Sequence, residues 1–158
     1  MQYLLLICLV ILSMVIMRGF KSIGLKPTRS FATSRELFEY FSNDKMVPPE
    51  TLDRYMKLDW CFIPSYTSLA LYALLIPTLS PLVPKWGKII CVVLMAFAIS
   101  FAVLDIFENL NTIRASHHDE EAARFVFNVR YLKETPIGII VAGLIIDACL
   151  LFKSVYRG

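Results

Sequence analysis

Charged residues are scarce in this sequence. They make up 18% of its 158 residues, whereas hydrophobic residues make up 57%, and the mean hydropathy is +0.62. A soluble domain of this size would expose a large excess of apolar surface to water. The shortage of charge therefore excludes an ordinary soluble domain and indicates that lipid is the solvent.

The long apolar stretches also lack the two-residue alternation that is typical of barrel strands. Helices are then the structure that can satisfy the backbone polar groups within hydrocarbon. A helix needs about 20 mostly apolar residues to cross a bilayer core of about 30 Å. Four stretches approach this length, namely residues 3–17, 62–79, 89–107 and 137–152. The sequence predicts an all-α fold in which residues 1–158 form a single domain, a polytopic membrane four-helix bundle with short cytoplasmic helices.

Basic residues are distributed unevenly around these stretches. Of the 16 lysines and arginines, 12 lie between the first and second stretches or between the third and fourth. The positive-inside rule places these two segments in the cytoplasm and both termini outside. The basic residues follow membrane topology and do not form the aromatic-basic surface of a nucleic-acid-binding protein.

The first stretch has no basic residue before it. Residues 18–21, which follow it, do not resemble the small-residue site at which a signal peptide is cleaved. We therefore expect a retained helix, with a cleaved leader as the alternative. A retained helix also gives an even number of spans.

Several signatures of chemistry are missing. No Ser-His-Asp order, glycine-rich phosphate loop or Cys-His pairing rises above chance, so nucleophilic catalysis has little support. The four cysteines occur singly, without the spacing of a zinc or redox site, and we expect packing residues, with pairing of Cys91 and Cys149 as the alternative. His117 and His118 would point about 100° apart on a helix, which favours a solvated pair. The sequence indicates no metal and identifies no cofactor.

The two cytoplasmic segments contain signals for helices of their own. Ser34 is placed to cap a short helix with an apolar side that includes Leu37 and Phe41. We expect this helix to pack beneath the bundle, with a position among the lipid headgroups as the alternative. The Pro-Pro-Glu sequence at residues 48–50 suits the first turn of a helix that runs directly into the second stretch. Ser116 is placed to cap a further helix that ends near residue 136.

Polar side chains gather where this topology brings helix ends to one cytoplasmic level. Asp59 and Tyr66 are seven residues apart at the start of the second stretch and share a helical face. Asp105, Glu108 and Asn109 share a face at the end of the third stretch, because they are three and four residues apart. These five residues are therefore predicted to meet.

Arg130 and Lys133 approach the start of the fourth stretch at the same level. Because a buried carboxylate without a partner is costly, we expect the acidic and basic side chains to form one network. That network is either a salt-bridge lattice that fixes helix register or a polar pocket with a function. Carboxylate oxygens suit Mg²⁺ or Ca²⁺, but Asp-x-x-Glu-Asn is too short a motif to indicate a metal site.

Asp147 is a separate intramembrane acid. It lies about 16 Å into the fourth stretch, near the bilayer midplane. An aspartate there costs about 2.5 to 3.5 kcal/mol on insertion scales, so it should face the bundle. Tyr72 lies at a similar depth and can donate a hydrogen bond, with Ser68 and Ser100 as other donors. We expect a structural hydrogen bond between helices, and a proton-relay or ligand-binding acid is the alternative.

Two motifs carry a resemblance to a known group of proteins. They are LDWCFIPSY at residues 58–66 and DIFEN at residues 105–109, of the forms LDxxFxxxY and DxxEN. In this combination the chain resembles a widespread group of small, functionally uncharacterised bacterial four-helix integral membrane proteins. The resemblance runs from the second stretch through the third, and it implies a bacterial inner membrane as the location. It implies that Asp59, Tyr66, Asp105, Glu108 and Asn109 form a unit, but it implies no reaction.

Two functions fit this pattern. We favour a structural or accessory membrane protein that contacts lipids and a membrane-protein partner or a second copy of itself, organised around the cytoplasm-side polar network. The alternative is a protein that binds or transforms a lipid-like molecule, with the Asp/Glu cluster as acid-base groups and Arg130 and Lys133 holding an anionic headgroup. The sequence does not decide whether the protein is an enzyme. Transport through a pore is disfavoured because the stretches carry no regular polar stripe.

Overall fold

The structure, a computed structural model, describes residues 2–129 and 135–155, and every regular element in these ranges is a helix. In chain order the elements are α1 (Gln2–Ile23), the 3₁₀ turn η1 (Thr28–Ser30), α2 (Ser34–Phe41), α3 (Pro49–Leu79), α4 (Lys85–Ser116), α5 (Glu120–Val129) and α6 (Thr135–Val155). The predicted all-α fold is confirmed for this part of the chain.

Three of the described helices, α1, α3 and α4, are long and apolar enough to cross a membrane. α3 has 31 residues and α4 has 32. At about 1.5 Å per residue, both helices extend well beyond a hydrocarbon core of about 30 Å. The described apolar part of α6, Gly138–Leu150, is shorter. Membrane-spanning helices are thus supported at three of the four predicted stretches, and the fourth span remains a prediction.

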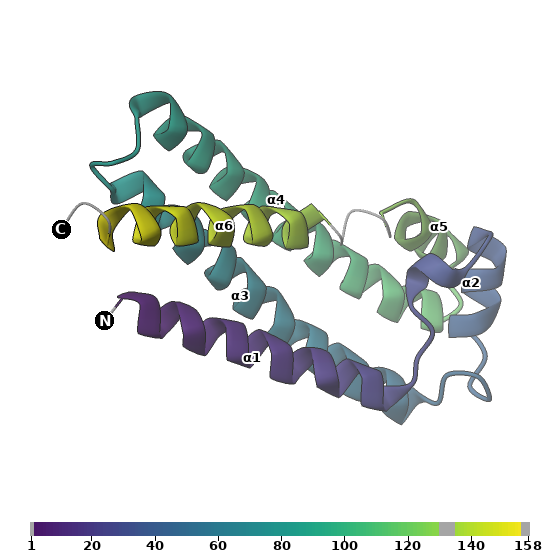
Figure 1. The fold of residues 1–158 in the computed structure, drawn as a ribbon. Helices are drawn as coiled ribbons and strands as arrows, with labels where there is room; N and C mark the ends of the chain where they lie inside the picture. Colours follow the sequence, from purple (N-terminus) through teal and green to yellow (C-terminus); the bar gives the residue numbers. More distant parts are fainter. Residues whose placement is uncertain (1, 130–134, 156–158) are drawn as a thin grey trace.

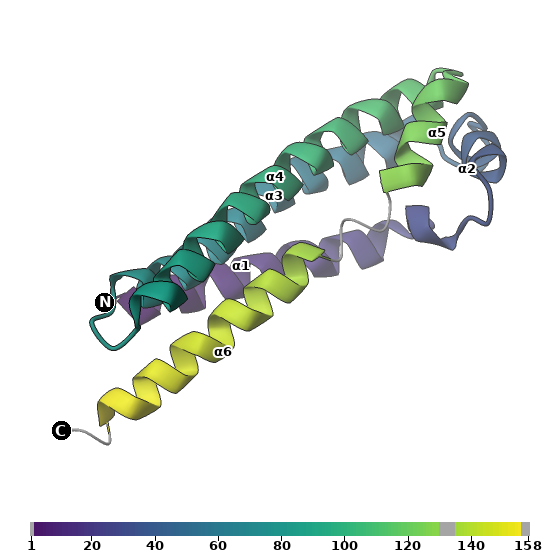
Figure 2. The same ribbon diagram turned by 90° about the horizontal axis from the view of Figure 1, so that it is seen from above.

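Helix α3 is the centre of the arrangement (Figure 1). It packs against α1, α4 and α6, and the view from above shows α3 and α4 running together with α6 to one side (Figure 2). The start of α1, the end of α6 and the turn between α3 and α4 lie at one end of the molecule. α2 and α5 lie at the other end, so the segments after the first and third stretches share one end, as predicted.

Helix α3 begins and continues as the sequence predicted. Pro49 is its first residue, and the helix runs without a break into the second apolar stretch. Pro64 and Pro77 lie inside it and supply no backbone N–H. The carbonyl groups of Trp60 and Ala73, four residues earlier, therefore lack their usual helical donor.

A small apolar core holds α2 and α5 against the ends of α3 and α4. Leu37 of α2, Ala115 of α4 and Val126 of α5 are fully buried in this core. The rings of Tyr40 and Phe41 meet edge to face beside them, with centroids 5.3 Å apart. The expectation that the short helix packs beneath the bundle agrees with these contacts.

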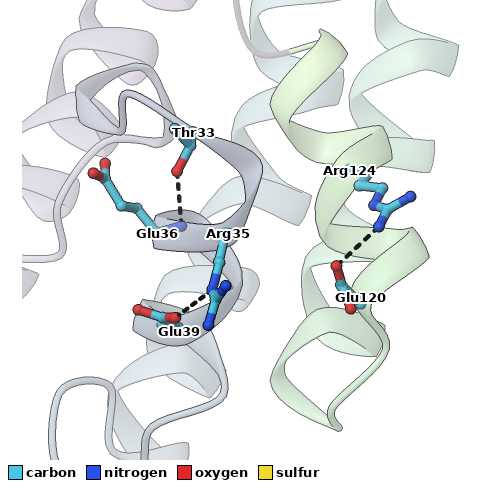
Figure 3. A network of polar contacts seen from close by, with 6 residues as sticks. All are labelled: Thr33, Arg35, Glu36, Glu39, Glu120 and Arg124. Carbon is cyan, nitrogen blue, oxygen red and sulfur yellow. Dashed lines mark hydrogen bonds and ion pairs between the residues drawn. The ribbon is translucent and has the colours of Figure 1, made fainter.

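The cap of α2 differs from the predicted one. Ser34 is the first residue of the helix, and the capping residue is Thr33, whose hydroxyl oxygen accepts a hydrogen bond from the backbone N–H of Glu36 at 3.1 Å (Figure 3). Thr33 has the extended backbone that a capping residue needs, with φ −133° and ψ 157°. The prediction was therefore wrong by one residue, because two adjacent hydroxyl side chains offered the same signal.

Figure 3 also shows one exposed ion pair on each short helix, Arg35 with Glu39 on α2 and Arg124 with Glu120 on α5. Both pairs are spaced by four residues, with N···O distances of 2.9 Å and 3.0 Å. Solvent-exposed pairs of this kind contribute about 0.3–0.5 kcal/mol each. The apolar core therefore contributes more than these pairs to the position of α2 and α5.

Helix α5 is capped by Asp119 and not, as predicted, by Ser116. Ser116 is the last residue of α4, where its hydroxyl donates to the carbonyl oxygen of Ile113 at 2.7 Å. Asp119 Oδ1 accepts a hydrogen bond from the backbone N–H of Ala122 at 3.0 Å, and Asp119 Oδ2 pairs with Arg114 at 2.6 Å. The bond from Ala122, and then the pairing with Arg114, hold the pKa of Asp119 below its ordinary value. The capping prediction failed because α4 continues well beyond the expected end of the third span.

The four cysteines are free in the structure, so the alternative pairing of Cys91 with Cys149 is contradicted. Cys91 is buried, with 2% of its surface exposed, and is a packing residue as expected. Cys8, Cys61 and Cys149 are exposed, so the packing prediction was wrong for them. A thiol behaves as a small hydrophobic group, so these positions suit an apolar surrounding.

Candidate functional site

Small side chains bring α3 and α4 together next to the predicted site. Ala102 of α4 is 8% exposed and packs with Ile63 and Tyr66 of α3. Ala98, one turn earlier on α4, is fully buried. Because alanine fills little space, the two helix backbones can approach each other closely. The polar residues that follow on α4 continue this buried face.

Five buried polar residues make up what we call the polar cluster. They are Asp59 and Tyr66 of α3 and Asp105, Glu108 and Asn109 of α4, with exposed fractions of 4%, 4%, 7%, 2% and 1%. The spacing of these residues along each helix places each set on one face. The structure therefore puts all five on inward-facing surfaces of two helices that pack together.

One hydrogen bond within the polar cluster joins the two helices directly. Tyr66 Oη donates to Asp105 Oδ2 at 2.5 Å, and both side chains are buried. The bond satisfies a carboxyl oxygen that would otherwise be costly to bury. It connects residues 39 positions apart in the chain, so it sets the height and rotation of α3 against α4.

Glu108 is contacted by the segment between α1 and α2. The Thr28 hydroxyl donates to Glu108 Oε1 across 3.5 Å, which is a long hydrogen bond. Thr112, one turn further along α4, is buried and donates to the Glu108 carbonyl oxygen at 2.9 Å. Asp59, Asp105 and Glu108 each have an interaction partner, so the carboxyl groups of the polar cluster are not isolated charges.

Asn109 differs from its neighbours in the polar cluster. Its side chain is 1% exposed, and its Nδ2 atom makes no hydrogen bond to the described part of the protein. A buried amide donor without an acceptor costs about 1–3 kcal/mol. The amide can therefore donate to an acceptor that enters the polar cluster.

Arg130 and Lys133, the predicted counter-charges of the polar cluster, lie outside the described residues. The helix predicted to lead into the fourth stretch is α5, which ends at Val129, and α6 begins at Thr135. The proposed pairing of basic residues with Asp59, Asp105 and Glu108 therefore stays a prediction.

Asp147 faces the interior, as its cost in lipid predicted, and is 3% exposed. The expected hydrogen bond between helices is not present, because neither carboxyl oxygen of Asp147 has a partner among the described residues. Tyr72 instead packs in an apolar cluster with Leu6 of α1 and Leu144 of α6. Ser68 and Ser100 are exposed, and the Ser100 hydroxyl donates within its own helix.

Sequence reasoning missed a polar contact between α1 and α3. The hydroxyl oxygens of Ser13 and Ser65 lie 3.0 Å apart, and both residues are buried. The signal was present in the spacing, because Ser13 is seven residues from Leu6 and three from Ile16, which are also buried. A lone serine in an apolar run can thus mark the packed face of a helix.

The histidine pair follows the last residue of α4. His117 and His118 are exposed and line a pocket of about 520 Å³ together with Asp44 and Asp53. Asp53 is already paired with Lys57 at 2.6 Å. Within residues 2–129 and 135–155, no group of three or more His, Cys, Asp or Glu side chains is arranged to hold a metal ion.

Fold and site together define a class of protein, an integral membrane protein of apolar helices with a buried polar cluster between two of them. No family model, curated protein or solved structure matches the chain. The class therefore rests on the helices themselves, and the resemblance to small bacterial four-helix proteins stays a prediction.

Proposed function

We propose that the protein is a structural or accessory component of a bacterial inner membrane, a four-helix bundle in which α6 is the fourth span. Both termini then face outward, and α2 and α5 lie in the cytoplasm. The location of 12 of the 16 basic residues between the first and second or third and fourth stretches supports this orientation. The 21 residues of α6 give it the length to span.

One observation carries the structural role. Asp59, Asp105 and Glu108 are buried, and each of them has an interaction partner. Removing one partner from a buried ionic or hydrogen-bonded group is strongly destabilising. Buried polar groups that keep all their partners specify a single arrangement of the helices that carry them. The polar cluster thus acts as a lock that keeps the cytoplasmic ends of α3 and α4 in one register.

The outward surface supports contact with other membrane components. Large apolar side chains are exposed along α4, among them Ile89, Val92, Val93, Phe97 and Val103. In α6, Gly138 is exposed, and nothing lies within 4 Å of a Cβ atom added to it. Small residues of this kind let another helix approach closely. These surfaces contact lipid, and they offer packing to a membrane-protein partner or a second copy.

Photo-crosslinking in native membranes tests the accessory role. A photoreactive amino acid is placed at Val93 or Val103 on α4, and at Ile11 on the exposed side of α1 as a matched control. The proposal predicts a discrete protein adduct from Val93 or Val103 on α4 and lipid adducts from Ile11. Lipid adducts alone from all three positions would contradict an accessory role that depends on a protein partner.

The unpartnered amide of Asn109 favours a second candidate, a site for a lipid-like ligand within the polar cluster. An ester or phosphate oxygen could accept the hydrogen bond that Asn109 Nδ2 does not make. The three neighbouring carboxyl groups would then act as binding or acid-base groups. An enzyme would be one form of this candidate.

Mass spectrometry of the intact protein, released gently from native membranes, separates the two candidates. Asp105→Asn, Glu108→Gln and Asn109→Leu are compared with the unmodified chain, and thermal unfolding is measured on the same samples. A structural lock predicts lower unfolding temperatures for Asp105→Asn and Glu108→Gln, no loss for Asn109→Leu because its amide donor has no acceptor to lose, and no bound molecule that depends on these residues. A ligand site predicts a bound molecule that the variants lose while their unfolding temperatures stay the same.

A further inference from the structure

Asp147 lies one turn after Gly143, the residue at which α6 comes close to α3. A Cβ atom added to Gly143 would be 3.1 Å from Ala73 Cβ and 3.6 Å from the Ala73 carbonyl carbon. Asp147 is four residues after Gly143 and shares its helical face. Because α3 and α6 both run toward the same end of the molecule (Figure 1), Asp147 is level with the turn of α3 that follows Ala73.

That turn of α3 carries oxygen atoms suited to a cation. Pro77 has no N–H, so the carbonyl oxygen of Ala73 lacks its usual helical donor, and both residues are buried. Thr78 follows Pro77, and its hydroxyl donates to the Leu74 carbonyl at 2.7 Å. The Thr78 side chain is also hydrogen-bonded to the Cys91 thiol, which leaves one lone pair on its oxygen to coordinate a cation. Helix α3 stays continuous through Pro77, but a carbonyl oxygen without its helical donor can coordinate a cation, as unwound backbone carbonyls do in membrane transporters.

Helix α4 closes the third side of this region. Cys91 is 2% exposed, interacts electrostatically with Asp147 and faces Thr78. Lys88, one turn earlier on α4, is half-buried, and Tyr72 of α3 packs in the neighbouring apolar cluster. Asp147 accepts a hydrogen bond from none of these groups. On α6 itself, Cys149 and Lys153 are exposed.

A buried carboxyl group in this position has two physical options. It holds a proton, or it binds a cation whose charge balances its own, because an unpaired carboxylate is too costly in an apolar bundle. We propose that Asp147, Thr78 and the Ala73 carbonyl form a site that exchanges one monovalent cation, either a proton or an alkali-metal ion. This site lies apart from the polar cluster and does not depend on the role proposed for it.

Labelling with N,N′-dicyclohexylcarbodiimide tests the site in membranes that contain the full-length protein. This hydrophobic reagent modifies a carboxyl group that carries a proton, and the product is located by mass spectrometry of the peptide that contains Asp147. Labelling is measured from about pH 5 to about pH 9, in sodium, potassium or choline chloride. Asp147→Asn is the control for specificity.

The two cation sources give different results. Proton exchange predicts labelling that falls about tenfold per pH unit above its midpoint and is the same in all three salts. An alkali-metal ion predicts that sodium or potassium chloride lowers labelling about fivefold or more relative to choline chloride at one pH. Labelling that is independent of both pH and salt would overturn the proposal, because Asp147 would then be a permanently neutral packing group.

Thermal unfolding gives a second readout that does not depend on access of the reagent. The proposal predicts that the unfolding temperature of the native protein changes with pH or alkali-metal ion in a way that Asp147→Asn abolishes. Thr78→Val, which keeps the carboxyl group and the side-chain shape, should weaken that dependence. A difference between native protein and Asp147→Asn that is constant across pH and salt would contradict an exchangeable cation.

Discussion

The hydroxyl group of Tyr66 joins the two longest helices through Asp105. Tyr66→Phe removes that donor and leaves a buried carboxyl oxygen short of a partner. We expect a loss of about 1–3 kcal/mol of stability, measured as unfolding in detergent. Tyr72→Phe is the matched control, because Tyr72 packs in an apolar cluster of the same helix. Equal effects of the two variants would show that the contact with Asp105 does not hold α3 to α4.

His118 stands where a helix normally ends in glycine. It has a positive φ of 68°, and the backbone N–H groups of His118 and Asp119 return to the carbonyl groups of Ala115 and Arg114 at 3.2 Å each. This is the Schellman arrangement, in which an L-residue at the left-handed position costs about 1–2 kcal/mol.

The variant His118→Gly removes this backbone strain, but glycine is more flexible in the unfolded chain, which offsets part of the gain. We therefore expect a net stabilisation of about 1 kcal/mol. Thermal unfolding measures the change. His117→Gly is the control, because His117 has an ordinary φ of −92° and should gain nothing. Destabilisation by His118→Gly would mean that the imidazole makes a contact worth more than the backbone strain.

Helix α5 begins at a carboxylate whose charge is part of its cap. The pKa of Asp119 is lowered from 3.8, first by the hydrogen bond from the Ala122 N–H. Because the pKa is lower in the folded protein than in the unfolded chain, this stabilisation is fully present at a pH above the ordinary pKa. It is lost as the pH falls through the pKa of the folded protein. The Ala122 amide resonance should therefore titrate with a midpoint below 3.8. In Asp119→Asn, which keeps a capping oxygen without the charge, the titration should disappear.

Helices α3 and α6 meet at a glycine, and a second glycine on α6 offers a matched comparison. A Cβ at Gly143 would lie 3.1 Å from Ala73 Cβ, whereas nothing lies within 4 Å of one at Gly138. Gly143→Ala should push α6 away from α3 and lower stability. Gly138→Ala should be neutral or stabilise by up to about 1 kcal/mol through helix propensity. The same loss from both variants in thermal unfolding would contradict the close approach.

The sequence predicted those elements whose signals are repeated many times along the chain. Apolar runs gave α1, α3 and α4, and residue spacing gave the inward faces that carry Asp59 and Asp105. Helix ends were less predictable, because neighbouring residues such as Thr33 and Ser34 can each act as a cap and packing selects one. The contact between Thr28 and Glu108 could not be predicted, because the irregular segment around Thr28 has no periodic pattern of apolar residues.

The whole molecule separates its polar and apolar groups by position along the helices. The acidic residues of the polar cluster lie toward the end that holds α2 and α5, while exposed apolar side chains cover α1 and α4. Composition predicted this membrane character, since it depends on totals and not on contacts. Whether Asp147 had a partner could not be predicted, because depth along a helix does not determine which way Tyr72 turns.

If the polar cluster is a structural lock, as we propose, its own side chains close it. A high-resolution density map of the protein purified from its native membrane tests it directly, at the space between Asp59, Asp105 and Glu108. A closed lock predicts side chains in direct contact, with the Tyr66 hydroxyl on Asp105 and no bound molecule between them. A lipid or other molecule held by these carboxyl groups and by the Asn109 amide would contradict the lock and identify the polar cluster as a binding site.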